Sequence, residues 1–119
     1  MNLSPELTAR CLALAGVSVP TPAPVVVTEK EFQAQVEREA VNRGWLAYHV
    51  YLSKKSRPGF PDCVFARDKR IILVELKAED GKLSPEQEEW KAVLEAVGGT
   101  VEYYVWRPSM TNDIILLLQ

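Results

Sequence analysis

Three polar residues beside apolar segments are of the types that act on phosphate groups. Residues 71–77 (IILVELK) are apolar except for Glu75 and Lys77. Side chains alternate along a strand, so these two residues are expected on one face. Asp62 opens the preceding strand and can face Glu75 across a hairpin. The group would then lie at a strand end, which is the edge where α/β sheets place ligand sites.

Two carboxylates that converge on one point repel each other unless a hard cation lies between them. Mg²⁺ is bound in this way, by one or two carboxylates together with water and substrate phosphate. Such a cation would polarise a phosphate and lower the pKa of water. Lys77 could orient that water or stabilise charge on the phosphate. The simpler interpretations are a turn residue at Asp62 and a surface ion pair between Glu75 and Lys77.

A longer pattern surrounds these residues. It consists of GFPD at 59–62, ELK at 75–77 and LSPEQ at 83–87. In this order the segments resemble the virus-type replication-repair nuclease (VRR-NUC) domain of the PD-(D/E)xK nuclease superfamily, over about residues 31–106. An isolated Glu-x-Lys is common by chance, whereas the whole series is much more specific.

The resemblance implies a divalent-metal endonuclease that uses Mg²⁺ or Mn²⁺. In such a domain Asp62 and Glu75 would bind the metal, and the carbonyl group of Leu76 would be a further ligand. Lys77 would be the catalytic lysine. A site that had lost its activity would be expected to have lost one of these core residues, and this sequence has kept them.

Two further residues are supported by the resemblance but have a second explanation. The family carries a glutamate on its first helix, and Glu31 occupies the matching place as a candidate metal ligand, with Glu29 as a near neighbour. Gln87 matches a polar residue on the helix after the lysine motif. A capping-box bond to Thr28 or Ser84 would explain each of them equally well. Both explanations stay open.

DNA is the partner that the resemblance implies. Stand-alone phage and bacterial members of the family look like dimeric nucleases of branched DNA such as Holliday junctions, and a chain of 119 residues resembles that type. The net charge of −2 leaves no overall basic footprint, so any contact with DNA must be local. The residues expected to contact the DNA backbone lie just upstream of the first carboxylate and are Lys54, Lys55 and Arg57.

A second group of positive charge, at Arg67, Lys69 and Arg70, has no assigned role, and a solvated charged loop would explain either basic group. Two other functions remain open. One is a non-cleaving DNA-binding module that keeps the nuclease fold. The other is a small α/β adaptor whose charges are incidental, which predicts no affinity for metal.

The elements that must position these residues follow from capping and turn signals. We expect helices over 29–43 and from Ser84 to Gly98. Strands are expected over 45–52, 62–67, 70–77 and 100–106, and the tail over 112–119 is either a helix capped by Asn112 or an edge strand. A strand that follows a helical crossover requires a parallel or mixed sheet. The sequence predicts an α/β fold, a small mixed sheet flanked by helices, and the resemblance implies a restriction-endonuclease-like core.

Size and composition indicate one ordinary globular domain. The chain has 47% hydrophobic and 25% charged residues and no apolar run near the roughly 20 residues that cross a bilayer. We read no secretory signal and expect the cytoplasm, that of the host cell for a phage protein. Residues 1–27, with a short helix over 3–15 and then alternate prolines, are expected to be an appendage and a candidate part of a dimer interface. The nuclease domain is expected over 28–119.

Cys11 and Cys63 are far apart and have no neighbouring Cys or His at metal-ligand spacing. This argues against a zinc site and favours reduced thiols. His49, the single histidine, is expected to be a packed or rim residue rather than a catalytic one.

Overall fold

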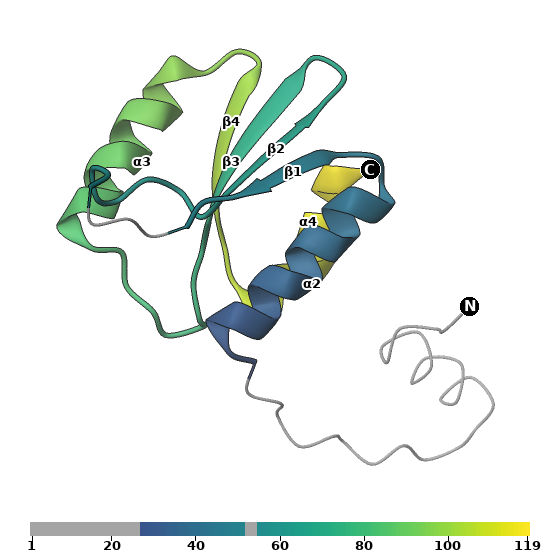
Figure 1. Ribbon diagram of the computed structural model, residues 1–119, viewed down its shortest axis with the longest axis horizontal. Helices are drawn as coiled ribbons and strands as arrows, with labels where there is room; N and C mark the ends of the chain where they lie inside the picture. The colour runs from purple at the N-terminus through teal and green to yellow at the C-terminus, as the bar shows by residue number, and fades with distance from the viewer. Residues whose placement is uncertain (1–26, 52–54) are drawn as a thin grey trace.

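A four-stranded mixed sheet forms the centre of the structure (Figure 1), a computed structural model that describes residues 27–51 and 55–119. The spatial order is β1-β2-β3-β4, with bounds Leu46–His49, Cys63–Arg67, Arg70–Leu76 and Val101–Trp106. The first three strands pair antiparallel, and β3 pairs parallel with β4. The predicted helix over 3–15 and the proline segment lie outside the described residues.

Helices cover both sides of this sheet. They are α2 (Glu29–Asn42), α3 (Pro85–Val97) and α4 (Thr111–Leu118), the last preceded by the 3-10 turn η1 (Pro108–Met110). In Figure 1, α2 and α4 lie together on one side and α3 lies on the other. The α/β prediction and the helical crossover between β3 and β4 are therefore confirmed. Among the described residues, no helix has the length and apolar character to cross a membrane.

The hydrophobic core lies between the sheet and the α2–α4 pair. Alternation along the strands brings Cys63, Phe65, Ile72 and Val74 to one face of the sheet. The helical residues packed against that face are Phe32, Val36, Ala40, Ile114 and Leu118. On the other face α3 buries no residue completely, and Val93 is 57% exposed. The two faces therefore differ strongly in how well they are covered.

The local signals in the sequence explain where the helices begin. Ser84 and Gln87 form a complete capping box, and Thr28 Oγ1 accepts a bond from the Glu31 N–H at 3.1 Å. The 29–43 helix ends one residue early, at Asn42, and Gly44 takes a φ of 85°. The predicted strand over 45–52 is shorter than expected, because the described pairing of β1 covers only Leu46–His49.

The C-terminal tail is a helix and not an edge strand, but the predicted cap at Asn112 is wrong. The turn η1 runs directly into α4, so the helix has already begun at Thr111. Ile114 and Leu118 lie four residues apart and both reach the core. This helical spacing, together with contacts from the sheet, selects helix over strand.

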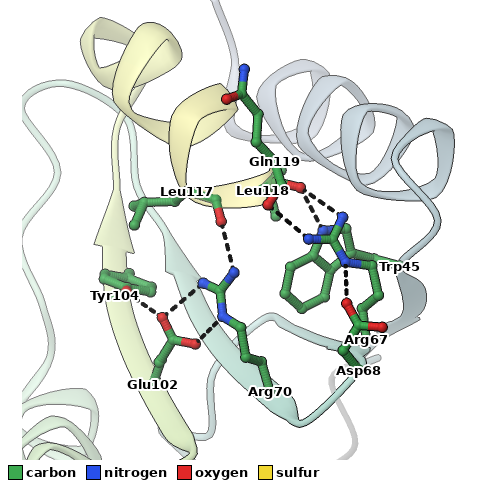
Figure 2. A network of polar contacts seen from close by, with 9 residues as sticks. All are labelled: Trp45, Arg67, Asp68, Arg70, Glu102, Tyr104, Leu117, Leu118 and Gln119. Atoms are coloured by element: carbon green, nitrogen blue, oxygen red, sulfur yellow. Dashed lines mark hydrogen bonds and ion pairs between the residues drawn. The ribbon is translucent and has the colours of Figure 1, made fainter.

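The second basic group anchors this helix (Figure 2). Trp45 Nε1 donates to the Leu118 carbonyl at 2.8 Å, and Arg67 donates to the Leu118 and Gln119 carbonyls at 3.0 and 2.7 Å. The guanidinium groups of Arg67 and Arg70 lie 4.5 and 5.1 Å from the Trp45 ring centre. Cations that pair with the last carbonyls of a helix stabilise its C-terminus. These arginines therefore serve the fold.

Candidate active site

Asp62 and Glu75 face each other at the open end of the β2–β3 hairpin. Cys63 is opposite Val74 in the register, so the preceding residue Asp62 falls opposite Glu75. The Leu76 N–H donates to Asp62 Oδ2 at 2.8 Å. The Val50 N–H donates to the Asp62 carbonyl at 2.8 Å. The side chain of Asp62 is thus fixed to β3 and its backbone to the residue that follows the end of β1.

Glu75 is a buried carboxylate with one oxygen left over. The residue is 1% exposed. Its Oε1 accepts a bond from Gln87 Nε2 at 2.8 Å, whereas its buried Oε2 has no hydrogen-bond partner among the described residues. Burial, and then the negative charge of Asp62, raise the pKa of Glu75 to about 8, and the charge of Lys77 opposes this rise. A divalent cation is the group that such a carboxylate pair fits.

The loop before Asp62 is fixed by α3. Gly59 has a φ of 92°, and a Cβ there would lie 2.5 Å from the backbone carbonyl carbon of Glu86. Phe60 packs edge-on against Trp90, with ring centres 5.1 Å apart, and Pro61 is fully buried. Only glycine combines this backbone conformation with this close approach. The GFPD motif therefore holds the first carboxylate against the helix that carries Gln87.

Gln87 makes the capping-box bond and also contacts Glu75. Its Oε1 accepts a bond from the Ser84 N–H at 2.8 Å, which closes the capping box. Its Nε2 donates to Glu75 Oε1 at 2.8 Å. The two explanations are therefore compatible, because the amide offers an acceptor to one partner and a donor to the other.

Lys77 directly follows β3. Its N–H donates to the Trp106 carbonyl at 3.0 Å, so the pairing with β4 fixes the backbone from which the side chain extends. The side chain is half-buried, and its charge acts on Glu75. The structure thus brings Asp62, Glu75, Lys77 and Gln87 together at one end of the sheet.

The acidic residue of α2 that acts on this group is Glu29. Glu29 and Glu31 are both exposed; the negative charge of Glu29 contributes to the raised pKa of Glu75, and the Glu31 N–H bonds to Thr28. Glu29 precedes the buried Phe32 by three residues, so the two lie on the same side of the helix. Helical periodicity could therefore have identified Glu29 from the sequence.

The expected DNA-binding residues lie outside this group. Lys54 lies outside the described residues, and Lys55 is exposed. Arg57 Nη2 contacts Glu89 Oε1 at 2.6 Å, and both side chains are mostly exposed. Acidic side chains lie closer to the site. After burial, the charges of Glu75, Glu95 and Glu88 raise the pKa of Tyr103. These negative charges would repel a phosphate group unless a bound cation or a basic side chain compensated them.

Comparisons with known proteins identify the family and the fold. The family model described as the VRR-NUC domain matches residues 8–105, so the match begins within the segment expected to precede the domain. A solved structure described as a VRR_NUC domain is similar in fold, with a TM-score of 0.62 and 24% identity, covering 76% of this chain and 96% of that one. A search of curated proteins gave no match.

Proposed function

The chain belongs to the VRR-NUC domain family, and from this premise we propose that it is a divalent-metal-dependent endonuclease that hydrolyses DNA phosphodiester bonds. Membership makes it a nuclease-type, DNA-processing domain. The observation that supports the finer proposal is the buried Glu75 beside Asp62, with one carboxylate oxygen unpaired. A buried, unpaired carboxylate is costly and is found where function requires it.

Asp62 and Glu75 are the residues that would hold Mg²⁺ or Mn²⁺. The carbonyl group of Leu76 is the proposed further ligand, because this residue follows Glu75 and its N–H already bonds to Asp62. Glu29 is the acidic residue of α2 that we include, since its charge acts on Glu75. A role for Glu31 stays a prediction from the resemblance.

The residues around the carboxylates have separate tasks. When bound, the cation supplies Lewis-acid stabilisation at a phosphate and makes water a better nucleophile at neutral pH. Gln87 fixes the orientation of the Glu75 carboxylate through its bond at 2.8 Å. Lys77 stabilises negative charge that develops on the phosphate or orients the attacking water.

The substrate class that we propose is branched DNA, including four-way junctions, cut by a homodimer. Both elements follow from the resemblance to stand-alone family members. Arg57 would exchange Glu89 for a DNA phosphate, which is a small cost because exposed ion pairs contribute little. Lys54 and Lys55 would add to the same contact.

Cleavage assays test the nuclease proposal directly. The purified protein is incubated with duplex, flap and four-way-junction DNA in the presence of Mn²⁺. Lys77→Ala and Asp62→Asn should each lower the rate at least about 100-fold, because each removes a group that stabilises the transition state. The matched controls, Lys69→Ala and Asp68→Asn, lie in the β2–β3 turn and should cut at the wild-type rate.

The possible results separate the candidate functions. Binding of DNA without cleavage of any substrate would support the non-cleaving DNA-binding module. Equal cleavage by wild type and by Asp62→Asn would reject the assigned site. Light scattering of the full chain and of a chain beginning at Thr28 tests the homodimer, and a monomer in both would remove it.

A further inference from the structure

Three side chains of different chemistry meet on the face of the sheet opposite the carboxylate pair. They are Glu37 of α2, His49 at the end of β1 and Cys63 at the start of β2. Residues 62 and 63 are adjacent in an extended chain, so Asp62 and Cys63 point to opposite faces. The cluster therefore lies on the other face of the sheet and shares no ligand with the site of Asp62 and Glu75, although the charges of both carboxylates act on Cys63.

The ligand atoms of this cluster are close to the spacing of a metal site. Glu37 Oε1 lies 3.8 Å from Cys63 Sγ and 3.8 Å from His49 Nδ1. One ligand atom from each residue lies within 4.8 Å of the others. Zinc–ligand bonds of about 2.0 to 2.3 Å at tetrahedral angles place ligand atoms roughly 3.4 to 3.6 Å apart. The two contacts of Glu37 need to shorten by a few tenths of an ångström to reach this spacing, and the remaining pair, within 4.8 Å, by up to about 1 Å.

We propose that Glu37, His49 and Cys63 form a second metal site, which binds a zinc-class divalent cation. Sulfur, imidazole nitrogen and carboxylate oxygen together form a donor set that selects such an ion over Mg²⁺. The carboxylate pair on the other face offers only oxygen donors, which favour Mg²⁺ over a zinc-class ion. The proposal goes beyond the nuclease function and does not depend on it.

The three ligands of this cluster differ in their exposure to solvent. Cys63 is 0% exposed and its thiol is free, whereas the His49 and Glu37 side chains are 29% and 31% exposed. The His49 ring packs edge-on against Tyr51, with ring centres 4.7 Å apart. An ion can therefore enter past the imidazole and the carboxylate and reach the sulfur last.

Binding requires two local changes. The Cys63 thiol donates to Glu37, and coordination would release that proton to solvent because the thiolate is the ligand form. The Gln33 side-chain nitrogen contacts both ring nitrogens of His49 and donates to Glu37 Oε1 at 3.4 Å. This amide would turn away from Nδ1, and water would complete the coordination as in three-ligand zinc sites.

A bound ion would connect three elements beneath the catalytic end of the sheet. Glu37 and Cys63 are 26 residues apart in the sequence. A cross-link between them would join α2 to β1 and β2 and stabilise the folded state by mass action. Sequence spacing argues against a zinc site because it considers near neighbours, whereas here the ligands come from separate elements.

Cobalt spectroscopy tests this site without using nuclease activity. The full chain is reduced, stripped of metal and titrated with Co²⁺, and a sulfur-to-cobalt charge-transfer band is recorded in the near ultraviolet. The band should reach its full intensity at one equivalent in the wild type and in Cys11→Ser. It should also persist in Asp62→Asn, because Asp62 supplies none of the three ligands. It should be absent in Cys63→Ala.

Further variants guard against a fold defect in Cys63→Ala. His49→Ala and Glu37→Gln keep the sulfur and should show the band at weaker affinity, and circular dichroism checks that each variant is folded. Zn²⁺ should raise the melting temperature of the wild type and of Cys11→Ser but not that of Cys63→Ala. The proposal is overturned if folded wild type shows no sulfur band, or if the band is lost in Cys11→Ser and kept in Cys63→Ala.

Discussion

The carboxylates at the two ends of the β2–β3 hairpin have opposite surroundings. At the turn end, Arg70 makes a two-pronged contact with Glu102 at 2.7 and 2.9 Å, and Tyr104 donates to the same carboxylate at 2.6 Å (Figure 2). At the open end, Glu75 has one bond, from Gln87, and its second oxygen has no partner among the described residues.

The pKa values of the two glutamates are shifted in opposite directions. Hydrogen bonds from Arg70 lower the pKa of Glu102, whereas burial and the charge of Asp62 raise that of Glu75. Glu75 lies on the central strand β3, and Glu102 lies on the neighbouring edge strand β4. A carboxylate whose charge is satisfied by the protein serves the fold, and one whose charge is left unsatisfied is available for a ligand.

The largest expected effect separates the two ends by activity. Glu75→Gln keeps the shape of the side chain but removes the charge that would hold a cation, so the rate of DNA cleavage should fall at least about 100-fold. Glu102→Gln should leave the rate within a few-fold of wild type. Measured rates on one junction substrate with Mn²⁺ check both, and a comparable loss in the two variants would contradict the contrast.

The next effect concerns the loop that positions Asp62. Gly59→Ala should lower the free energy of unfolding by roughly 2 to 4 kcal/mol. Alanine is strained at this positive φ, and its Cβ would also clash with the Glu86 backbone. The matched control is Gly99→Ala, at a φ of 65° with nothing within 4 Å of its Cβ, which should cost about 1 kcal/mol. Urea unfolding measures both, and equal losses would show that the contact with α3 is unimportant.

The open end should also make stability depend on pH in metal-free buffer. The pKa of Glu75 is raised from 4.5 to about 8, so between these values the folded protein holds a proton that the unfolded chain has lost. The stabilisation is complete below this window and is lost as pH rises through it, by up to about 1.4 kcal/mol per pH unit. Urea unfolding across the window should show a slope in the wild type that Glu75→Gln reduces. An unchanged slope would reject the assignment.

The smallest effect is a loss of stability at the turn end. Glu102→Gln should lower the free energy of unfolding by about 1 to 2 kcal/mol, because the acceptor of the Arg70 bonds loses its negative charge. The loss is limited because both side chains are partly exposed to water. Thermal unfolding at neutral pH measures this. A variant as stable as the wild type would mean that the network contributes little to the fold.

Much of the fold could be predicted from local signals. The capping residues at Thr28 and Ser84 identify where two helices begin, and the helical crossover before β4 requires a mixed sheet. The tail could not be decided, because the run IILLL is apolar throughout and fits a helix or a strand. Contacts from Trp45, Arg67 and Arg70 to the tail carbonyls come from distant parts of the chain and have no local signature.

The site was predictable to the extent that it follows the periods of strands and helices. A period of two and a short turn place Asp62 opposite Glu75. The helical period also places Glu29, three residues before Phe32, on the buried side of α2. The cluster of Glu37, His49 and Cys63 could not be predicted, because it depends on the packing of α2 against two strands.

Binding of Mn²⁺ to metal-free protein, followed by the electron paramagnetic resonance signal of the free ion, tests the central claim most directly. Wild type and Asp68→Asn, at the turn end, should bind the ion with equal affinity. Asp62→Asn and Glu75→Gln, at the open end, should bind it at least about 10-fold more weakly. Equal binding by wild type and by both open-end variants would show that the carboxylate pair is not the cation site.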